Sequence, residues 1–223
     1  MSDYLSGYSG SSGSEQWKRK ATAAFTRALS SILLVLGMLA VMWVLEIFDY
    51  TLGGALDVYG IVAWSPDHLS GILFAPFLHG GFAHLTANSL PLLILGVLAA
   101  MRGIGRFLAA TLIIMLVSGV GVWLTTSPYY VTIGASGLVF GYFGLVVTRG
   151  LFDRRLVDIL VGVGVAVAYY SLLWGVLPGQ PGISWQGHLF GLIGGVLAAW
   201  LLRRRKPEVS GPSARSGLPP TLW

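Results

Sequence analysis

The chain has 223 residues, of which 55% are hydrophobic and only 10% are charged, with a formal net charge of +5. A soluble domain carries about 25% charged residues, so this composition excludes a soluble enzyme or nucleic-acid-binding domain and indicates an integral membrane protein. Cysteine is absent, which excludes disulfides and thiolate metal sites.

The chain divides into two polar ends and a long apolar middle. Residues 1–27 are predicted to form a disordered N-terminal tail, because residues 1–16 are rich in Ser and Gly with little to bury. A bilayer span needs about 20 apolar residues. Six apolar runs are candidates, at residues 28–48, 82–101, 107–124, 133–148, 156–174 and 185–202, of which the fourth is short and rich in glycine. The membrane domain is therefore predicted at 28–203, followed by a disordered tail at 204–223.

The basic residues orient these runs. All 14 lysines and arginines precede the first run, follow the sixth, or lie between runs two and three or four and five. The connections 49–81, 125–132 and 175–184 contain none. Because Lys and Arg concentrate in cytoplasmic loops, both termini are predicted to be cytoplasmic. The expected fold is an all-α membrane protein, a bundle of six transmembrane helices.

Four polar residues fall at one depth in this topology. His84 and Asn88 occupy the first turns of the second run, counted from the outer face, and share one helix face. Ser136 begins the fourth run and His188 begins the sixth, also at the outer face. Polar groups inside a membrane are costly and are usually functional, so this level is predicted to be a site.

Glycines predict how closely the fourth and sixth runs approach. Glycines recur at separations of three or four along both runs, at 134, 137, 141 and 144 and at 187, 191, 194 and 195. Such small faces let helix backbones pack closely, although packing alone would also explain them. Each face carries one reactive group, Ser136 or His188, so close packing would bring a hydroxyl to an imidazole.

This pair has the chemistry of acyl transfer. A serine needs an adjacent base to become a nucleophile, and histidine, with a pKa near 6.5, suits that role. The helix N-terminus at Ser136 offers unpaired N–H groups. His84 and Asn88 could add donors and complete an oxyanion hole.

Three motifs in chain order, "HGGFAHLTAN", "GASG" and "GHLFG", resemble those of the rhomboid family of intramembrane serine proteases. The resemblance covers roughly residues 28–203 and implies a fold of six spans. It implies that Ser136 is the nucleophile, His188 the general base and acid, and His84, Asn88 and the Ser136 N–H the oxyanion donors. It further implies structural roles for His79, Gly134, Gly137, Phe140 and Gly191.

Three features depart from the family pattern. Ser70 and Gly71 stand where many members carry a Trp-Arg pair in the first outer loop. Phe140 replaces a tyrosine that stacks on the catalytic histidine, and Gly187 replaces an alanine. No carboxylate is evident as a third catalytic member, so a Ser–His dyad is expected, with His188 oriented by packing.

The resemblance implies a serine endopeptidase of a bacterial plasma membrane, without metal or cofactor. Its substrates would be single-span or multi-span membrane proteins, cleaved near the outer face, and its surroundings the lipid bilayer. No nucleic-acid partner is expected. One alternative is an inactive rhomboid-like protein that binds membrane segments, although such relatives usually lack the serine or the histidine. A small transporter is a second alternative, but its ionisable residues would lie nearer the membrane midplane.

Overall fold

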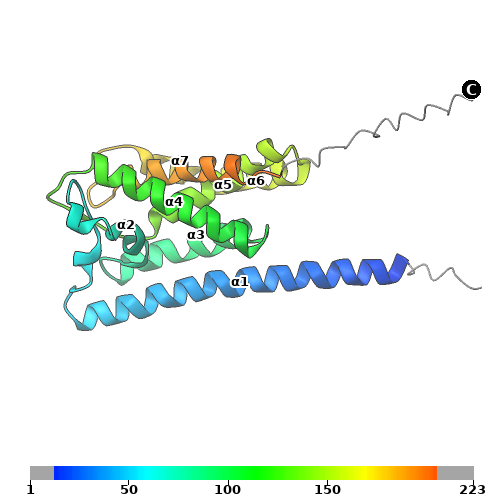
Figure 1. Ribbon diagram of the computed structural model, residues 1–223, viewed down its shortest axis with the longest axis horizontal. Helices are drawn as coiled ribbons and strands as arrows, with labels where there is room; N and C mark the ends of the chain where they lie inside the picture. The colour runs from blue at the N-terminus through cyan, green and yellow to red at the C-terminus, as the bar shows by residue number, and fades with distance from the viewer. Residues whose placement is uncertain (1–12, 205–223) are drawn as a thin grey trace, which may run out of the picture.

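The computed structural model describes residues 13–204, which form a bundle of helices with one very short β-sheet. The α-helices are α1 (Gly13–Thr51), α2 (Gly71–Phe74), α3 (Phe82–Ala100), α4 (Ile104–Thr125), α5 (Ser136–Asp153), α6 (Leu156–Ala168) and α7 (Trp185–Leu201). Four 3-10 helices and two strands lie between them, at η1 (Asp57–Tyr59), β1 (Ile61–Val62), η2 (Pro66–His68), η3 (Ala75–Phe77), β2 (Val131–Thr132) and η4 (Tyr170–Val176). Both ends of the described chain lie at the same end of the bundle (Figure 1).

Each of the six predicted apolar runs contains a helix, but not all of these helices have the length and composition of a span. Within residues 13–204, α1, α3 and α4 are long and apolar enough to cross a membrane. A fourth candidate is the pair α6–η4, which is bent by 67°. Helix α7 has only 17 residues, and α5 carries Arg149 and Asp153 within its 18 residues. The chain is thus a helical membrane protein, and the count of six spans stays a prediction.

Helix α1 begins much earlier than the sequence predicted. Its 39 residues extend over about 58 Å at 1.5 Å per residue, whereas the hydrocarbon core of a bilayer is about 30 Å thick. Residues 13–27 are helical instead of forming part of a disordered tail, because Gln, Lys, Arg and Ala there favour helix. Residues 1–12 and 205–223, which make up the rest of the two predicted tails, lie outside the described residues.

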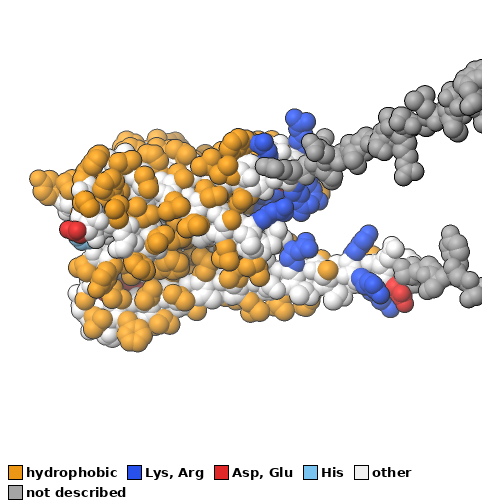
Figure 2. Space-filling view, in the orientation of Figure 1, with side chains coloured by type: hydrophobic (Ala, Val, Ile, Leu, Met, Phe, Trp, Pro, Cys, Tyr) orange, Lys and Arg blue, Asp and Glu red, His pale blue; other side chains and the backbone are white. Residues whose placement is uncertain are grey.

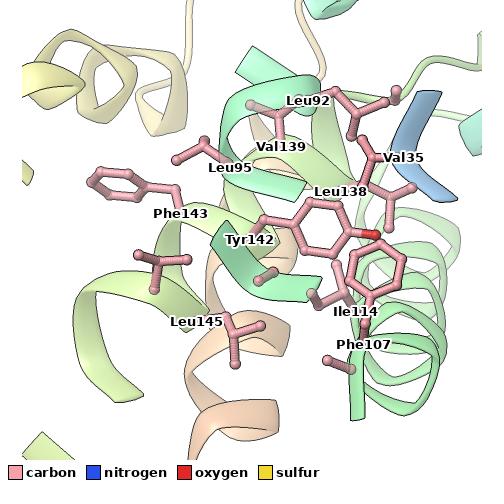
Figure 3. Packing of buried hydrophobic residues seen from close by; sticks show 14 of the residues in the cluster. Val35, Leu92, Leu95, Phe107, Ile114, Leu138, Val139, Tyr142, Phe143 and Leu145 are labelled. Atoms are coloured by element: carbon pink, nitrogen blue, oxygen red, sulfur yellow. The ribbon is translucent and has the colours of Figure 1, made fainter. Parts of the chain in front are cut away.

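The core is centred on Tyr142 of α5, whose side chain is fully buried. Its ring stacks on Phe107 of α4 at a centroid distance of 5.3 Å, with Leu138 and Ile114 nearby (Figure 3). The hydroxyl would be costly there without a partner, and it forms a hydrogen bond of 2.7 Å with Thr111 Oγ1. Tyr142 thus ties α5 to α4 two turns below the N-terminus of α5.

Helices α5 and α7 are in very close contact, because glycines face each other across the interface. A Cβ atom built at Gly191 would collide with the carbonyl group of Gly137. Next to this contact, Ser118 Oγ of α4 donates to the carbonyl oxygen of Gly187 at 3.0 Å. These contacts hold the C-terminal half of α4 and the N-terminal ends of α5 and α7 together around the residues that precede His188.

The loop between α1 and α3 is held by backbone packing at Ser70 and Gly71, where the resemblance leads us to expect a Trp-Arg pair. A Cβ atom at Gly71, which starts α2, would collide with the backbone of Gly60. Strand β1 then pairs antiparallel with β2, joining Ile61 to Thr132 and Val62 to Val131. The loop is therefore fastened to the segment that leads into Ser136.

Candidate active site

Ser136 is the first residue of α5 and is half-buried. Gly134, two residues before it, has φ +120°, a conformation that residues with a side chain rarely adopt. The turn is held by Gly134 N–H, which donates to the carbonyl oxygen of Ala75 at 2.9 Å. Among residues 13–204, no acceptor pairs with the backbone N–H of Ser136 or Gly137, as expected for the first turn of a helix. Two donors therefore lie free beside the serine.

His188 lies in the first turn of α7 with only 8% of its surface exposed. Its Nδ1 is 2.8 Å from the carbonyl oxygen of Gly175 in η4. Since a carbonyl only accepts, Nδ1 must carry the proton, which leaves Nε2 of the neutral ring as the acceptor. Phe140 of α5 also holds the imidazole. Its ring stacks on that of His188 with a centroid distance of 4.0 Å and an interplanar angle of 10°.

Ser136 and His188 are brought to the same contact between α5 and α7. Phe140, which stacks on His188, lies one helical turn after Ser136 on the same face. Among the described residues there is no hydrogen bond between Ser136 Oγ and His188 Nε2 in this conformation. Catalytic hydrogen bonds often tighten only when substrate binds, so the arrangement places the two groups near one another without closing the contact.

The two histidines of the "HGGFAHLTAN" motif both touch the turn before Ser136. His79 Nε2 accepts the backbone N–H of Ala135 at 3.2 Å, and its side chain is only 2% exposed. His84 lies with its ring centroid 5.1 Å from that of His79. A Cβ atom at Gly134 would be 2.7 Å from His84 Nε2, so this nitrogen lies against the Gly134 backbone.

Burial and the neighbouring imidazole of His84 lower the pKa of His79 from 6.5 to about 4. The ring is therefore neutral at physiological pH, as its role as an acceptor requires. Asn88, one turn along α3, is also buried and donates from Nδ2 to the carbonyl oxygen of His84 at 3.1 Å. The second hydrogen of that NH₂ group remains for another acceptor.

A small pocket of about 30 Å³ opens beside Ser136. Its wall comes from α4, α5, the loop between α1 and α3, the segment before α5 and the start of α7, including Met115, Ser118, Val122, Gly134 and Gly137. This volume holds one or two water molecules or a small side chain. Within residues 13–204, no three His, Asp or Glu side chains are grouped so that they could hold a metal ion.

Sequence reasoning did not identify Gly175, which provides the acceptor for His188. A backbone carbonyl leaves no side-chain signature, and its direction depends on the 67° bend between α6 and η4. It also did not identify Ser118, whose hydroxyl bonds the backbone of α7. The sequence signal for Gly175 was limited to its being a glycine in the connection before the sixth run.

Comparisons with known proteins agree with this architecture. The model of the Rhomboid domain family matches residues 66–205. An uncharacterized protein of Mycobacterium tuberculosis is 41% identical over 196 residues, which are 83% of this chain and 82% of that protein. YdcA of Bacillus subtilis, provisionally named as a rhomboid protease, is 28% identical over a region that covers 82% of this chain and 93% of the length of YdcA. The rhomboid protease GluP of Bacillus subtilis is 32% identical over 71% of this chain, and the matched region covers 32% of the length of GluP.

Proposed function

The chain belongs to the rhomboid family, and from that premise we propose that it is an intramembrane serine endopeptidase whose nucleophile is Ser136 and whose general base is His188. The observation that carries this proposal is the hydrogen bond from His188 Nδ1 to Gly175 O. It fixes the tautomer in which Nε2 can accept a proton. Phe140 holds the same ring on the face of α5 that begins with Ser136.

The reaction proceeds through an acyl-enzyme. Ser136 Oγ attacks the carbonyl carbon of the scissile bond while its proton passes to His188 Nε2. The tetrahedral intermediate collapses, and the leaving amine takes the proton from Nε2. Water then attacks the ester with His188 again as base, releasing the new carboxyl terminus and restoring the Ser136 hydroxyl. The imidazolium formed in each half is stabilised by Gly175 O at Nδ1–H, where other serine proteases use a carboxylate.

Negative charge on the substrate oxygen needs donors that are already in position. The free N–H groups of Ser136 and Gly137 are two candidates at the N-terminus of α5, where the helix dipole favours an anion. His84 and the remaining hydrogen of Asn88 are the side-chain candidates. His79 has a supporting role, since it holds the N–H of Ala135 just before this group.

The substrate class follows from where the site lies. We assign it as a transmembrane segment, because Ser136 begins a helix of the bundle and not a surface loop. A helix in lipid keeps its carbonyls hydrogen-bonded, so the segment must unwind locally, which Gly and Pro favour. The small pocket beside Ser136 favours a small residue such as Ala at the cut position. With both termini cytoplasmic, cleavage occurs near the outer face of a bacterial plasma membrane.

The test is cleavage of a single-span substrate reconstituted with the protein in bilayers. Wild type should cut after a small residue, whereas Ser136→Ala and His188→Ala should each abolish cutting. The double variant should be no worse than either single variant, because the two groups act as one unit. Ser127→Ala, in the outer loop before β2, is the matched control and should cut normally. Capture of the segment without cutting by wild type would favour the inactive, binding-only alternative.

A further inference from the structure

Helix α1 buries two acidic side chains that the proposed chemistry does not use. Glu46 and Asp49 lie on one face of α1, one turn apart, and are 4% and 7% exposed. Glu46 falls near the outer end of the first predicted span. Ionisable residues within membrane segments are costly and usually functional, so a buried carboxyl group at this place requires a physical reason.

No basic side chain compensates these carboxyl groups. Among residues 13–204, no ion pair joins Glu46, Asp49 or the nearby Asp57 to a lysine or arginine. The outer connections contain neither residue type, and Figure 2 shows the Lys and Arg side chains gathered at the other end of the molecule. Asp49 and Asp57 instead lie close enough to Glu46 to repel a charge on it. Hydrogen bonds must therefore offset the cost of its burial.

The hydrogen bond of Glu46 leads to the start of α3. The backbone N–H of Gly81, the N-cap of α3, donates to the Glu46 carboxyl group. In a capping box this N–H is bonded by a Glu or Gln at the third position of the same helix. That position of α3 is His84. Glu46 of α1 thus makes the bond that α3 cannot make for itself, and a carboxylate there also suits the positive end of the helix.

Aromatic contacts join α1 to the same part of α3. The ring of Phe82, the first residue of α3, has centroid distances of 6.1 Å to Trp43 and 5.5 Å to Tyr50. Trp43 Nε1 donates to Ser89 Oγ at 3.2 Å. In Figure 1, α1 lies along α3. The outer half of α1 therefore holds the first two turns of α3, with Glu46 as its buried polar contact.

These two turns carry the side-chain candidates for the oxyanion hole. His84 lies against the backbone of Gly134 in the turn before Ser136. Asn88 follows one turn later and donates to the carbonyl oxygen of His84. A movement of the start of α3 would displace both donors relative to Ser136. Misplacement of a catalytic group by about 1 Å can cost about 10²-fold in rate.

We propose that Glu46 is a positioning residue, which bonds the N-cap of α3 and so fixes His84 and Asn88 relative to Ser136. This inference rests on the proposed protease function. Glu46 acts through the start of α3 and touches no reacting atom. Asp49 has a different role, because its Oδ1 accepts the backbone N–H of Leu56 at 2.6 Å and holds the loop that follows α1.

The experiment compares three variants of Glu46 by steady-state cleavage of a reconstituted single-span substrate. Glu46→Met has a similar length but no acceptor oxygen, Glu46→Gln keeps an acceptor, and Glu46→Asp keeps the charge but shortens its reach. Asp49→Asn is the matched control, because it removes a negative charge from the same face and keeps Oδ1 for Leu56. Amide hydrogen exchange at residues 81–85, which needs no cleavage, measures opening of the start of α3 in each variant.

Glu46→Met should lower kcat about tenfold with KM unchanged, which is less than the 10²–10³-fold cost of losing an oxyanion donor outright. Glu46→Asp should lose less, whereas Glu46→Gln and Asp49→Asn should stay within about twofold of wild type. In a His84→Ala background, Glu46→Met should cost no more than about twofold further, because the two residues act through one contact. Exchange at residues 81–85 should be faster in Glu46→Met, but exchange at the start of α5 should not.

Two results would overturn the positioning role while leaving the protease function intact. One is cleavage by wild type with the same kcat in Glu46→Met and Glu46→Asp, and the other is an equal loss of kcat in Glu46→Gln and Glu46→Met. A wild type that cuts no substrate would instead refute the proposed function. In every case, unchanged exchange at residues 81–85 in Glu46→Met and Glu46→Asp would show that Glu46 does not hold the start of α3.

Discussion

Replacing Gly175 with alanine perturbs the proposed base without altering any side chain of the proposed dyad. A Cβ atom at Gly175 would lie 2.8 Å from Phe140 Cζ and 2.9 Å from His188 Nδ1. Ordinary contacts between such atoms are about 3.5–4.0 Å. The stacked pair of His188 and Phe140, or the η4 segment itself, must therefore shift by roughly 0.6–1.2 Å.

This shift determines the expected magnitude. Misplacement of a catalytic group by about 1 Å can cost about 10²-fold in rate, so kcat of Gly175→Ala should fall by about that factor. KM should change little, because Gly175 does not line the pocket beside Ser136. A fall in kcat with KM preserved identifies loss of an interaction used in the transition state.

The assay is steady-state cleavage of a fluorogenic transmembrane peptide in bicelles, with melting temperatures measured alongside. Gly164→Ala in α6 is the matched control, because a Cβ atom there has no neighbour within 4 Å. It should keep wild-type kcat. If folded Gly175→Ala cuts with kcat within about twofold of wild type, His188 does not depend on the Gly175 carbonyl and the reasoning is refuted.

Three further predictions concern His79, the pocket beside Ser136 and the orientation of the chain in the membrane. Because the pKa of His79 is lowered to about 4 in the folded protein, the unfolded chain binds more protons below pH 6.5. The free energy of unfolding should therefore fall as the pH drops from 6.5 toward 4, and it should fall less steeply in the variant His79→Asn. If its dependence on pH is the same in His79→Asn as in wild type, this reasoning is wrong. Met115→Ala should enlarge the pocket and raise the rate for Leu relative to Ala at the cut position, measured by competition between two substrates; an unchanged ratio would show that the pocket does not hold that side chain. In the cysteine-free chain, Tyr129→Cys should react with an impermeant thiol reagent from outside and Leu156→Cys should not; the reverse pattern would overturn the orientation.

Sequence periodicity and motif order located the helices well where apolar runs were long. The run expected at 82–101 corresponds to α3 at Phe82–Ala100, and that at 107–124 lies within α4. The start of α1 at Gly13 was missed because residues 13–27 favour helix but are polar, and low hydropathy was taken to indicate a disordered tail. Helix α6 also ends at Ala168 and bends into η4, a break that the hydropathy of the run at 156–174 does not signal.

The side chains of the candidate site could be proposed from the sequence, but most of its backbone contacts could not. Ser136, His188 and the motif histidines could be chosen from depth and from family resemblance. The unpaired N–H groups at the start of α5 were expected from a helix N-terminus at Ser136, but the carbonyl of Gly175 and the pairing of β1 with β2 depend on how loops fold against one another. Backbone groups are the same in every residue, so their roles emerge only from three-dimensional geometry.

The central claim is that Ser136 is an activated nucleophile, and its most direct test is reaction of the folded protein with a fluorophosphonate. Intact-mass and peptide analysis should find one adduct, on Ser136, formed in wild type and Ser127→Ala. The adduct should be absent in Ser136→Ala and formed far more slowly in His188→Ala. Labelling of another serine, or labelling of Ser136 at the same rate without His188, would contradict the account.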